Sequence, residues 1–167
     1  MAIKPRIGID VDETIVDTKS VWKQWCLDNY GIDLKYTKEI TDPKLLEFWK
    51  QPDLYKELEP IPEAKETIDF LYNSYEIIFL SHCFPEHLES KIDFLSKFKY
   101  HQFIDTFDKY KVPLDYIIDD RDIFFEPIKQ QNLSTVCILL KTEYLDRNIA
   151  DYKFSNWNEI KQFFKKN

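Results

Sequence analysis

Glycine and cysteine are scarce in this chain of 167 residues, and each shortage excludes something. With two glycines, most tight turns must rely on Pro, Asn and Asp. The three cysteines, Cys26, Cys83 and Cys137, form no CxxC pair, and their odd number fits a reducing compartment better than a disulfide framework. We therefore expect free thiols and a cytoplasmic location.

Basic residues are also in deficit, which disfavours a long nucleic acid as a partner. Lys and Arg number 23 against 30 Asp and Glu, so the formal net charge is −7, whereas a nucleic-acid backbone is bound by many basic side chains. No apolar run approaches the ~18 residues that would span a bilayer, and the N-terminus lacks the pattern of a secretory signal. We expect no membrane partner, and a homodimer is left open.

The apolar residues that are present form four short runs between stretches of helical periodicity. The hydrophobic share of 44% and the aromatic share of 16% are typical of a folded domain. Helical spacing of apolar residues covers 62–73 and 85–98, and a last helix is expected from about Asn156. This alternation favours an α/β fold with a parallel sheet flanked by helices. The expected strands cover residues 7–11, 76–80, 116–118 and 135–140.

The segment after the first strand breaks the alternation and has helical periodicity throughout. An apolar stripe from Val21 to Cys26 belongs to a helix that ends at Gly31, and Asp42 and Pro43 supply the N-cap and first residue of another helix. A helical insertion in this position predicts a lid over the ends of the sheet. We therefore expect a core of residues 1–17 and 61–167 and a helical cap of residues 18–60, called the cap segment below.

Two pairs of acidic residues follow two of the expected strands. Asp10 and Asp12 stand at the end of the first strand, and Asp119 and Asp120 stop the third one abruptly. Residues i and i+2 of an extended chain share a face, although an Asp in this position also commonly caps a turn. Ligands of parallel sheets bind beyond the carboxyl ends of the strands, so both pairs can converge there. Clustered carboxylate oxygens suit Mg²⁺, and the sequence predicts a magnesium site.

Four motifs in sequential order strengthen this interpretation. They are DVDET after the first strand, the strand IIFLS that ends at Ser81, Lys109, and IIDDR at the end of the third strand. Together they resemble the motifs of the haloacid dehalogenase superfamily of phosphatases, and four motifs in order are far more specific than any one alone. The resemblance implies a Rossmann-like core with a small helical cap inserted after the first strand.

Three further stretches are similar to the 5'(3')-deoxyribonucleotidases, and this similarity covers nearly the whole chain. They are EFWKQPDLYKELEPIPEA at 47–64, Asp108-Lys109 shortly before the second acidic pair, and SNWNEIKQF at 155–163. The chain departs from the family at Glu63, where glycine is usual, and in the HCF stretch that follows Ser81. The resemblance implies an Mg²⁺-dependent phosphomonoesterase that acts on (deoxy)ribonucleoside monophosphates.

The resemblance also implies how the acidic residues would share the reaction. Asp10 would attack phosphorus to form an aspartyl-phosphate, and Asp12 would act first as general acid and then as general base. Mg²⁺ would be held by Asp10, the backbone carbonyl of Asp12, and Asp120. Asp119 would orient the site, and Arg121 would do so by pairing with a neighbouring carboxylate.

The remaining candidate residues would hold the substrate. Ser81 would donate a hydrogen bond to the phosphate, although it also suits an N-cap of the following helix. Lys109 would stabilise the transferring group, with Lys111 as a rival, and Trp49 offers an aromatic face for a base. The substrate-binding residues implied are Thr18, Phe48, Trp49, Ser81, His82 and Lys109.

Three other functions stay open on the sequence alone. A polynucleotide 3'-phosphatase also carries a DDR-like segment, although the acidic chain counts against it. Another small-molecule phosphatase of the same superfamily is a second alternative. A non-catalytic nucleotide-binding module is a third, and it is disfavoured because every expected catalytic position is filled.

Overall fold

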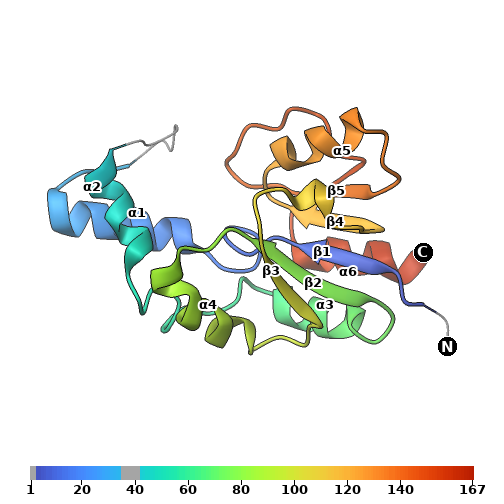
Figure 1. Ribbon diagram of the computed structural model, residues 1–167, viewed down its shortest axis with the longest axis horizontal. Helices are drawn as coiled ribbons and strands as arrows, with labels where there is room; N and C mark the ends of the chain where they lie inside the picture. Colours follow the sequence, from blue (N-terminus) through green and yellow to red (C-terminus); the bar gives the residue numbers. More distant parts are fainter. Residues whose placement is uncertain (1–2, 35–41) are drawn as a thin grey trace.

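The computed structural model describes residues 3–34 and 42–167 and contains a six-stranded parallel sheet. The strand order is β3-β2-β1-β4-β5-β6 (Figure 1). Because the chain builds outward in one direction from β1 and then in the other from β4, the sheet has its switch point between these two strands, where open α/β sheets form a crevice. The strands are β1 Arg6–Ile9, β2 Glu76–Ser81, β3 Gln102–Asp105, β4 Tyr116–Asp119, β5 Val136–Leu140 and β6 Tyr152–Phe154.

The four predicted strands are confirmed, and two more were missed. β3 and β6 lie at the two edges of the sheet, and their side chains are exposed or half-buried. Their sequences, QFID and YKF, therefore show no apolar run of the kind that marks a strand buried on both faces. Each pairs in parallel with a single neighbour, β3 with β2 and β6 with β5.

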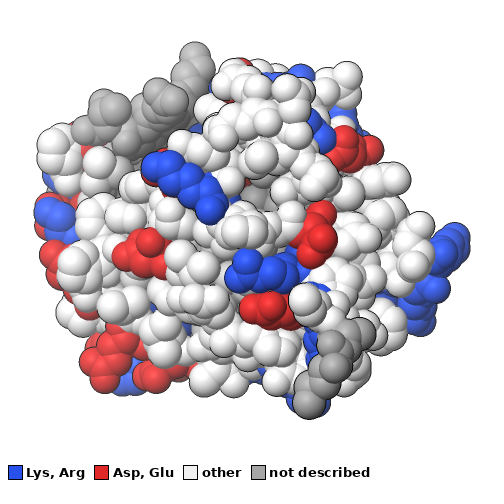
Figure 2. Space-filling model, turned by 45° about the vertical axis from the view of Figure 1, so that its right-hand side comes forward, with Lys and Arg blue, Asp and Glu red and all other residues white. Residues whose placement is uncertain are grey.

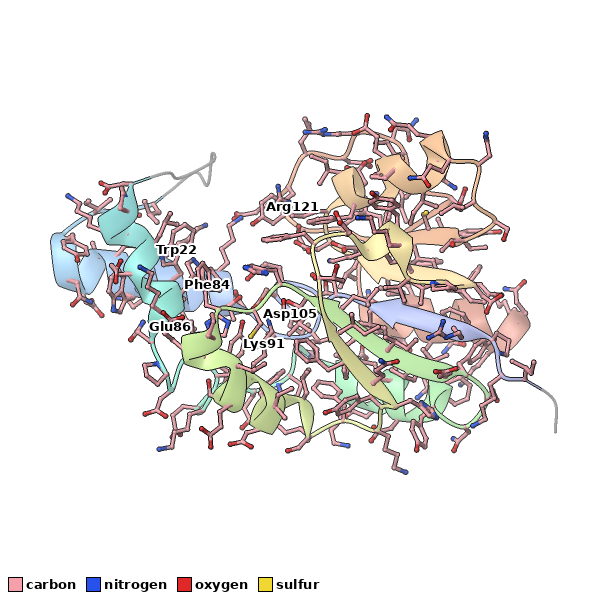
Figure 3. All side chains as sticks on the ribbon, viewed as in Figure 1. Trp22, Phe84, Glu86, Lys91, Asp105 and Arg121 are labelled. Carbon is pink, nitrogen blue, oxygen red and sulfur yellow. The ribbon has the colours of Figure 1, made fainter. Side chains whose placement is uncertain are left out.

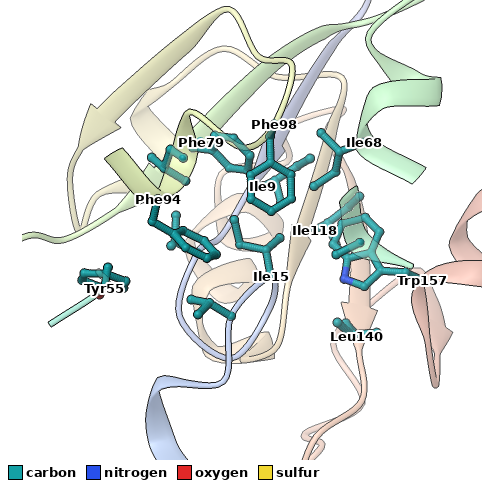
Figure 4. Packing of buried hydrophobic residues seen from close by; sticks show 14 of the residues in the cluster. Ile9, Ile15, Tyr55, Ile68, Phe79, Phe94, Phe98, Ile118, Leu140 and Trp157 are labelled. Carbon is teal, nitrogen blue, oxygen red and sulfur yellow. The ribbon is translucent and has the colours of Figure 1, made fainter. Parts of the chain in front are cut away.

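Helices cover both faces of the sheet and bury alternate residues of each central strand. On the side of α3, α4 and α6, Ile9, Phe79 and Ile118 join one apolar cluster (Figure 4). On the side of α5, Ile78 and Ile117 join another. This period-2 division is what a parallel sheet between two helical layers requires. The helices are α3 Ala64–Leu71, α4 Leu88–Leu95, α5 Glu126–Gln130 and α6 Trp157–Lys166, with 3₁₀ helices η2 Pro85–His87, η3 Lys109–Lys111 and η4 Asp122–Phe125.

The cap segment forms helices beside the carboxyl ends of the strands (Figure 1). They are α1 Thr18–Tyr30, α2 Pro43–Leu46 and the 3₁₀ helix η1 Glu47–Lys50. Asp17 caps α1 by accepting a hydrogen bond from the Ser20 N–H, and Gly31 ends it at φ 66°, in the left-handed region that glycine tolerates. Asp42 caps α2 by accepting a hydrogen bond from the Lys44 N–H. The division into core and cap segment stays a prediction, and residues 35–41 lie outside the described residues.

Trp157 at the start of α6 holds the loop after β1 by a hydrogen bond. This indole is fully buried, and its Nε1 donates a hydrogen bond of 2.8 Å to the Thr14 carbonyl. The Trp157 carbonyl in turn accepts from the Thr67 hydroxyl of α3. The last helix therefore holds in place the loop that follows the first acidic pair.

Replacing Trp157 with Phe should therefore lower stability. The change leaves the Thr14 carbonyl buried without its donor, which costs about 1–3 kcal/mol, and removes part of a buried ring. Urea unfolding would measure the loss. Tyr152→Phe, at an aromatic residue that is 45% exposed, is the control and should stay within about 0.5 kcal/mol of the wild type. Equal stabilities for the two variants would contradict this anchoring role.

Candidate active site

The two acidic pairs meet at the switch point of the sheet, as predicted. Asp10 and Asp12 follow β1, Asp119 ends β4 and Asp120 follows it. One carboxylate oxygen from each of Asp10, Asp119 and Asp120 lies within 4.8 Å of the others. The backbone holds them there, because the Asp10 N–H donates to the Ile118 carbonyl at 2.9 Å. Three largely buried carboxylates this close require compensating positive charge.

Lys109 supplies part of that charge. It begins η3 after β3, is almost fully buried, and its Nζ donates to Asp10 Oδ1 at 2.7 Å and also to Asp119. Burial alone lowers the pKa of Lys109, but the two carboxylates outweigh burial and raise it. Lys109 is therefore a cation fixed between two acids. Its rival Lys111 is exposed and pairs with Asp108 at 2.6 Å, so the geometry favours Lys109.

Asp120 shows why a metal ion fits this cluster. Its Oδ2 is buried and has no hydrogen-bond partner in the described part of the chain, while its Oδ1 accepts from Thr14 at 3.3 Å. Burial and then the charge of Asp10 raise the pKa of Asp120 well above its usual range, and the same causes raise the pKa of Asp119 to about 7. Oxygen ligands with excess negative charge and an orphaned acceptor match the preference of Mg²⁺.

Asp12 points into a different environment from Asp10. Its Oδ1 accepts from the Tyr55 hydroxyl at 2.6 Å and from Thr18 at 3.1 Å. Its Oδ2 accepts from Lys91 Nζ at 3.0 Å and from Ser81 at 3.4 Å. Burial raises the pKa of Asp12, but Lys91 and then Tyr55 outweigh it, so the pKa lies below its ordinary value. The two neighbouring acids are thus held by separate sets of donors.

Lys91 is a site residue that the sequence analysis missed. It lies on α4, is fully buried, and donates to Ser81 Oγ at 2.7 Å and to the His82 carbonyl at 3.2 Å, besides Asp12. Figure 3 shows it below the strand ends, away from Arg121. A signal was present, because Lys91 falls between Leu88 and Leu95 on the apolar spacing of that helix. A lysine within an apolar stripe needs a buried partner.

The cap segment contributes a second missed residue, Tyr55, and brings Thr18 to the same carboxylate. Tyr55 is 1% exposed, so its hydroxyl reaches Asp12 from a well-packed ring. Thr18 is also buried, and its hydroxyl donates to Asp12 at 3.1 Å and to Glu13 at 2.9 Å. Glu13 has φ 66° and a pKa raised to about 7 by burial. The substrate-binding role of Thr18 stays a prediction, but its contact with Asp12 is clear.

Arg121 orients the site by a route other than the predicted one. None of the ion pairs in residues 3–34 and 42–167 includes its guanidinium, which instead lies 5.0 Å from the Tyr144 ring and 5.8 Å from the Phe124 ring. The prediction of a carboxylate partner was therefore wrong. Its backbone N–H, however, donates to Asp119 Oδ1 at 3.0 Å and so positions that acid.

The aromatic residues predicted to meet the substrate differ in accessibility. Phe48 is 2% exposed and packs edge-on against Trp49 and at a tilt against Trp25. Trp49 is half-buried. His82 lies directly after Ser81 with more than a third of its side chain exposed. The substrate contacts of all three stay predictions.

His87 joins the cap segment to the core. Its ring is buried and accepts a hydrogen bond at Nε2 from the Phe84 N–H at 3.2 Å, so Nδ1 carries the proton and donates to the Trp49 carbonyl at 2.5 Å. Burial lowers the pKa of His87, which keeps the ring neutral as this pair of bonds requires. The loop after β2 and the 3₁₀ helix η1 are therefore tied by one imidazole.

Comparison with known proteins identifies the family. Residues 4–167 match the profile of the family described as 5' nucleotidase, deoxy (pyrimidine), cytosolic type C protein. The chain belongs to this family. It is therefore a phosphoric monoester hydrolase of the 5'-nucleotidase type.

Individual relatives of this nucleotidase agree with the family match. A candidate 5'(3')-deoxyribonucleotidase of Staphylococcus epidermidis is 23% identical over 182 residues, which covers 96% of each chain. A HAD-superfamily hydrolase of Ehrlichia chaffeensis matches with a TM-score of 0.58 and 17% identity over 99% of this chain and 98% of its own. A haloacid dehalogenase-like family hydrolase of Streptococcus pneumoniae matches with a TM-score of 0.64 and 12% identity. The match covers 97% of this chain and 98% of that one. The predicted Rossmann-like fold of the haloacid dehalogenase superfamily is thus confirmed.

The described part of the nucleotidase contains no helix that is both long and apolar enough to span a membrane. The three cysteines are free, as expected from the sequence, and all three are buried.

The neutral imidazole of His87 should make stability fall in mild acid. The unfolded chain takes up a proton near the ordinary pKa of about 6.5, whereas the folded protein resists protonation because the pKa of His87 is lowered. The contribution of His87 to the free energy of unfolding is therefore complete above about pH 6.5. It is lost as the pH falls towards the pKa of His87 in the folded protein, at up to about 1.4 kcal/mol per pH unit.

The comparison that isolates this effect is between the wild type and His87→Gln. Chemical unfolding at a series of pH values from about 7.5 to 5 measures both proteins. The wild type should lose more stability over this interval than the variant, because the buried carboxylates affect both equally. Parallel curves would contradict the assignment.

Proposed function

We propose that this nucleotidase is an Mg²⁺-dependent 5'(3')-deoxyribonucleotidase that releases phosphate from deoxyribonucleoside monophosphates through an aspartyl-phosphate. The observation that carries the proposal is the separation of Asp10 from Asp12 into two sets of contacts. Asp10 is bound by Lys109 within the acidic cluster, whereas Asp12 is bound by Lys91, Tyr55 and Ser81. Such a pair can divide nucleophilic and acid–base roles between two neighbouring carboxylates.

In the first half-reaction, an oxygen of Asp10 forms a bond to phosphorus while the bond from phosphorus to the nucleoside oxygen breaks. Asp12 gives its proton to that departing oxygen. Asp12 is ionised in the free protein because Lys91 and Tyr55 lower its pKa, and a phosphate dianion beside it would raise the pKa again. The substrate itself would therefore bring the proton carrier into its acid form.

In the second half-reaction, Asp12 removes a proton from water as the water oxygen attacks phosphorus. The bond between phosphorus and Asp10 then breaks, and the carboxylate and inorganic phosphate are released. Ser81 is held by Lys91 at 2.7 Å beside Asp12 and would donate to a phosphate oxygen. When phosphate leaves, Asp12 releases to solvent the proton that it took from the water, so that each residue ends the cycle in the state in which it began.

Asp10, Asp120 and the backbone carbonyl of Asp12 would hold Mg²⁺. The ion neutralises charge on the phosphate when it is bound. Asp119 would remain an orienting group, because Lys109 and the Arg121 N–H already occupy its oxygens. Lys109 and Lys91 add two cations from different elements, which is how an acidic chain could accept a phosphate ester.

The surface supports a small substrate over a polynucleotide. In the face shown in Figure 2, basic side chains are scattered among acidic and neutral ones and form no continuous stripe. A nucleic-acid backbone is usually met by such a stripe.

The reaction is tested by phosphate release from dUMP and dTMP. Release should require Mg²⁺, fall to background in EDTA, and return when Mg²⁺ is added in excess. Asp10→Asn should lower the rate of phosphate release by at least about a thousandfold, because an amide is not a nucleophile. Robust hydrolysis in EDTA would contradict the proposal. Faster hydrolysis of a 3'-phosphorylated oligonucleotide than of mononucleotides would favour a polynucleotide 3'-phosphatase.

Lys91 gives a second test with a matched lysine as control. Lys91→Met removes the ammonium beside Asp12 and Ser81 and should lower kcat/KM for dUMP by about a hundredfold or more, because electrostatic groups of this kind contribute about 2.7–4 kcal/mol. Lys111→Met removes an exposed lysine and should change it by less than about threefold. Similar effects in the two variants would show that Lys91 has no role in the reaction.

A further inference from the structure

A group of aromatic rings on the segments that follow Ser81 and precede Lys109 has no role in the chemistry proposed above. His82 and Phe107 stack with ring centroids 3.9 Å apart at 24°, and Phe84 meets His82 edge-on at 5.5 Å. Phe107 is 62% exposed and Phe84 36%. His82, Phe84 and Phe107 are called the ring ledge below. Because Phe107 is mostly exposed, packing within the protein does not account for its stack with His82.

The ledge grows from the two segments that deliver the catalytic groups. His82 directly follows Ser81, whose hydroxyl contacts Asp12, and Phe107 lies two residues before Lys109, whose Nζ contacts Asp10. The strands that precede them, β2 and β3, are paired neighbours. With consecutive Cα atoms about 3.8 Å apart, the ledge lies one or two residues from contacts to both catalytic acids.

The ledge is held in a fixed arrangement by Asp105 at the end of β3. Its Oδ1 accepts from the Cys83 N–H at 3.0 Å and lies 3.3 Å from Nδ1 of His82. His87 holds the other end of the same loop through the Phe84 N–H. A flat surface that is ordered before the ligand arrives binds it with a smaller entropy cost.

We propose that the ring ledge is the subsite for the base of the nucleotide, which stacks on the His82–Phe107 pair while the phosphate lies at Asp10 and Lys109. This inference rests on the proposed function. Stacking on aromatic rings is tolerant of sequence because every base has a π-face. The ledge would therefore admit purine and pyrimidine monophosphates, and esters without a base would lose this contact.

The ledge is a better platform than Trp49, the residue that the sequence analysis favoured. The Trp49 ring meets Phe48 edge-on at 5.1 Å and Trp22 at 5.8 Å, so it already packs within the cap segment. In the described residues, the ring contacts of Phe107 are with His82 alone, which leaves its other face open.

The test compares dUMP with 2-deoxyribose 5-phosphate, which has the same sugar and phosphate but no base. Phe107→Ala should raise KM for dUMP about tenfold, from the loss of one stacking contact, with kcat within about twofold and both constants for the sugar phosphate unchanged. Phe107→Trp should retain the wild-type KM. Phe70→Ala, at a ring on α3 that is 37% exposed, is the control and should change nothing.

Two results would overturn the ledge. One is an equal effect of Phe107→Ala on both esters, or no effect on either. The other is a rise in KM for dUMP in Trp49→Ala but not in Phe107→Ala.

Binding without turnover separates failure of the ledge from failure of the proposed function. Calorimetry on Asp10→Asn with Mg²⁺ measures affinity for dUMP and for the sugar phosphate whether or not the wild type hydrolyses either. Tighter binding of dUMP that is lost with Phe107→Ala supports the ledge even if turnover of nucleotides is absent. Equal affinities for the two esters overturn it even if dUMP is hydrolysed.

Discussion

The buried ammonium of Lys109 between Asp10 and Asp119 is the interaction on which the site depends. It joins the loop after β3 to the ends of β1 and β4, at the switch point of the sheet. Without it, three acids within 4.8 Å would face one another with burial opposing every charge. A lysine alone does not balance three carboxylates, and Oδ2 of Asp120, which has no hydrogen-bond partner among residues 3–34 and 42–167, is a buried acceptor that a further positive charge would satisfy.

Two lysines from different elements explain how the two aspartates in the sequence DVD can differ. Lys109 arrives from the β3 side and contacts Asp10, whereas Lys91 arrives from α4 and contacts Asp12. The side chains share a face of the chain, yet their donors come from separate elements. Different local fields follow, and the proposed division of roles between Asp10 and Asp12 rests on this difference.

Much of the candidate site could be predicted from the sequence, because its acidic residues lie at the ends of buried strands. Asp10 and Asp119 were predicted because an apolar run followed by a charge marks where a buried strand meets the crevice, whereas Lys109 was predicted through the family resemblance alone. Lys91 and Tyr55 were missed because each reaches Asp12 over a long separation in sequence, 79 and 43 residues. The edge strands β3 and β6 were missed for a related reason: half-exposed strands lack the apolar run that marks their neighbours.

Tyr55 also changes what the cap segment does. The segment does more than lie beside the strand ends, because Tyr55 donates a hydrogen bond of 2.6 Å to Asp12 and His87 ties the segment to the β2 loop. Displacing the cap segment would remove a donor that lowers the pKa of Asp12. The position of the cap segment and the pKa of Asp12 are therefore coupled through the Tyr55 hydroxyl.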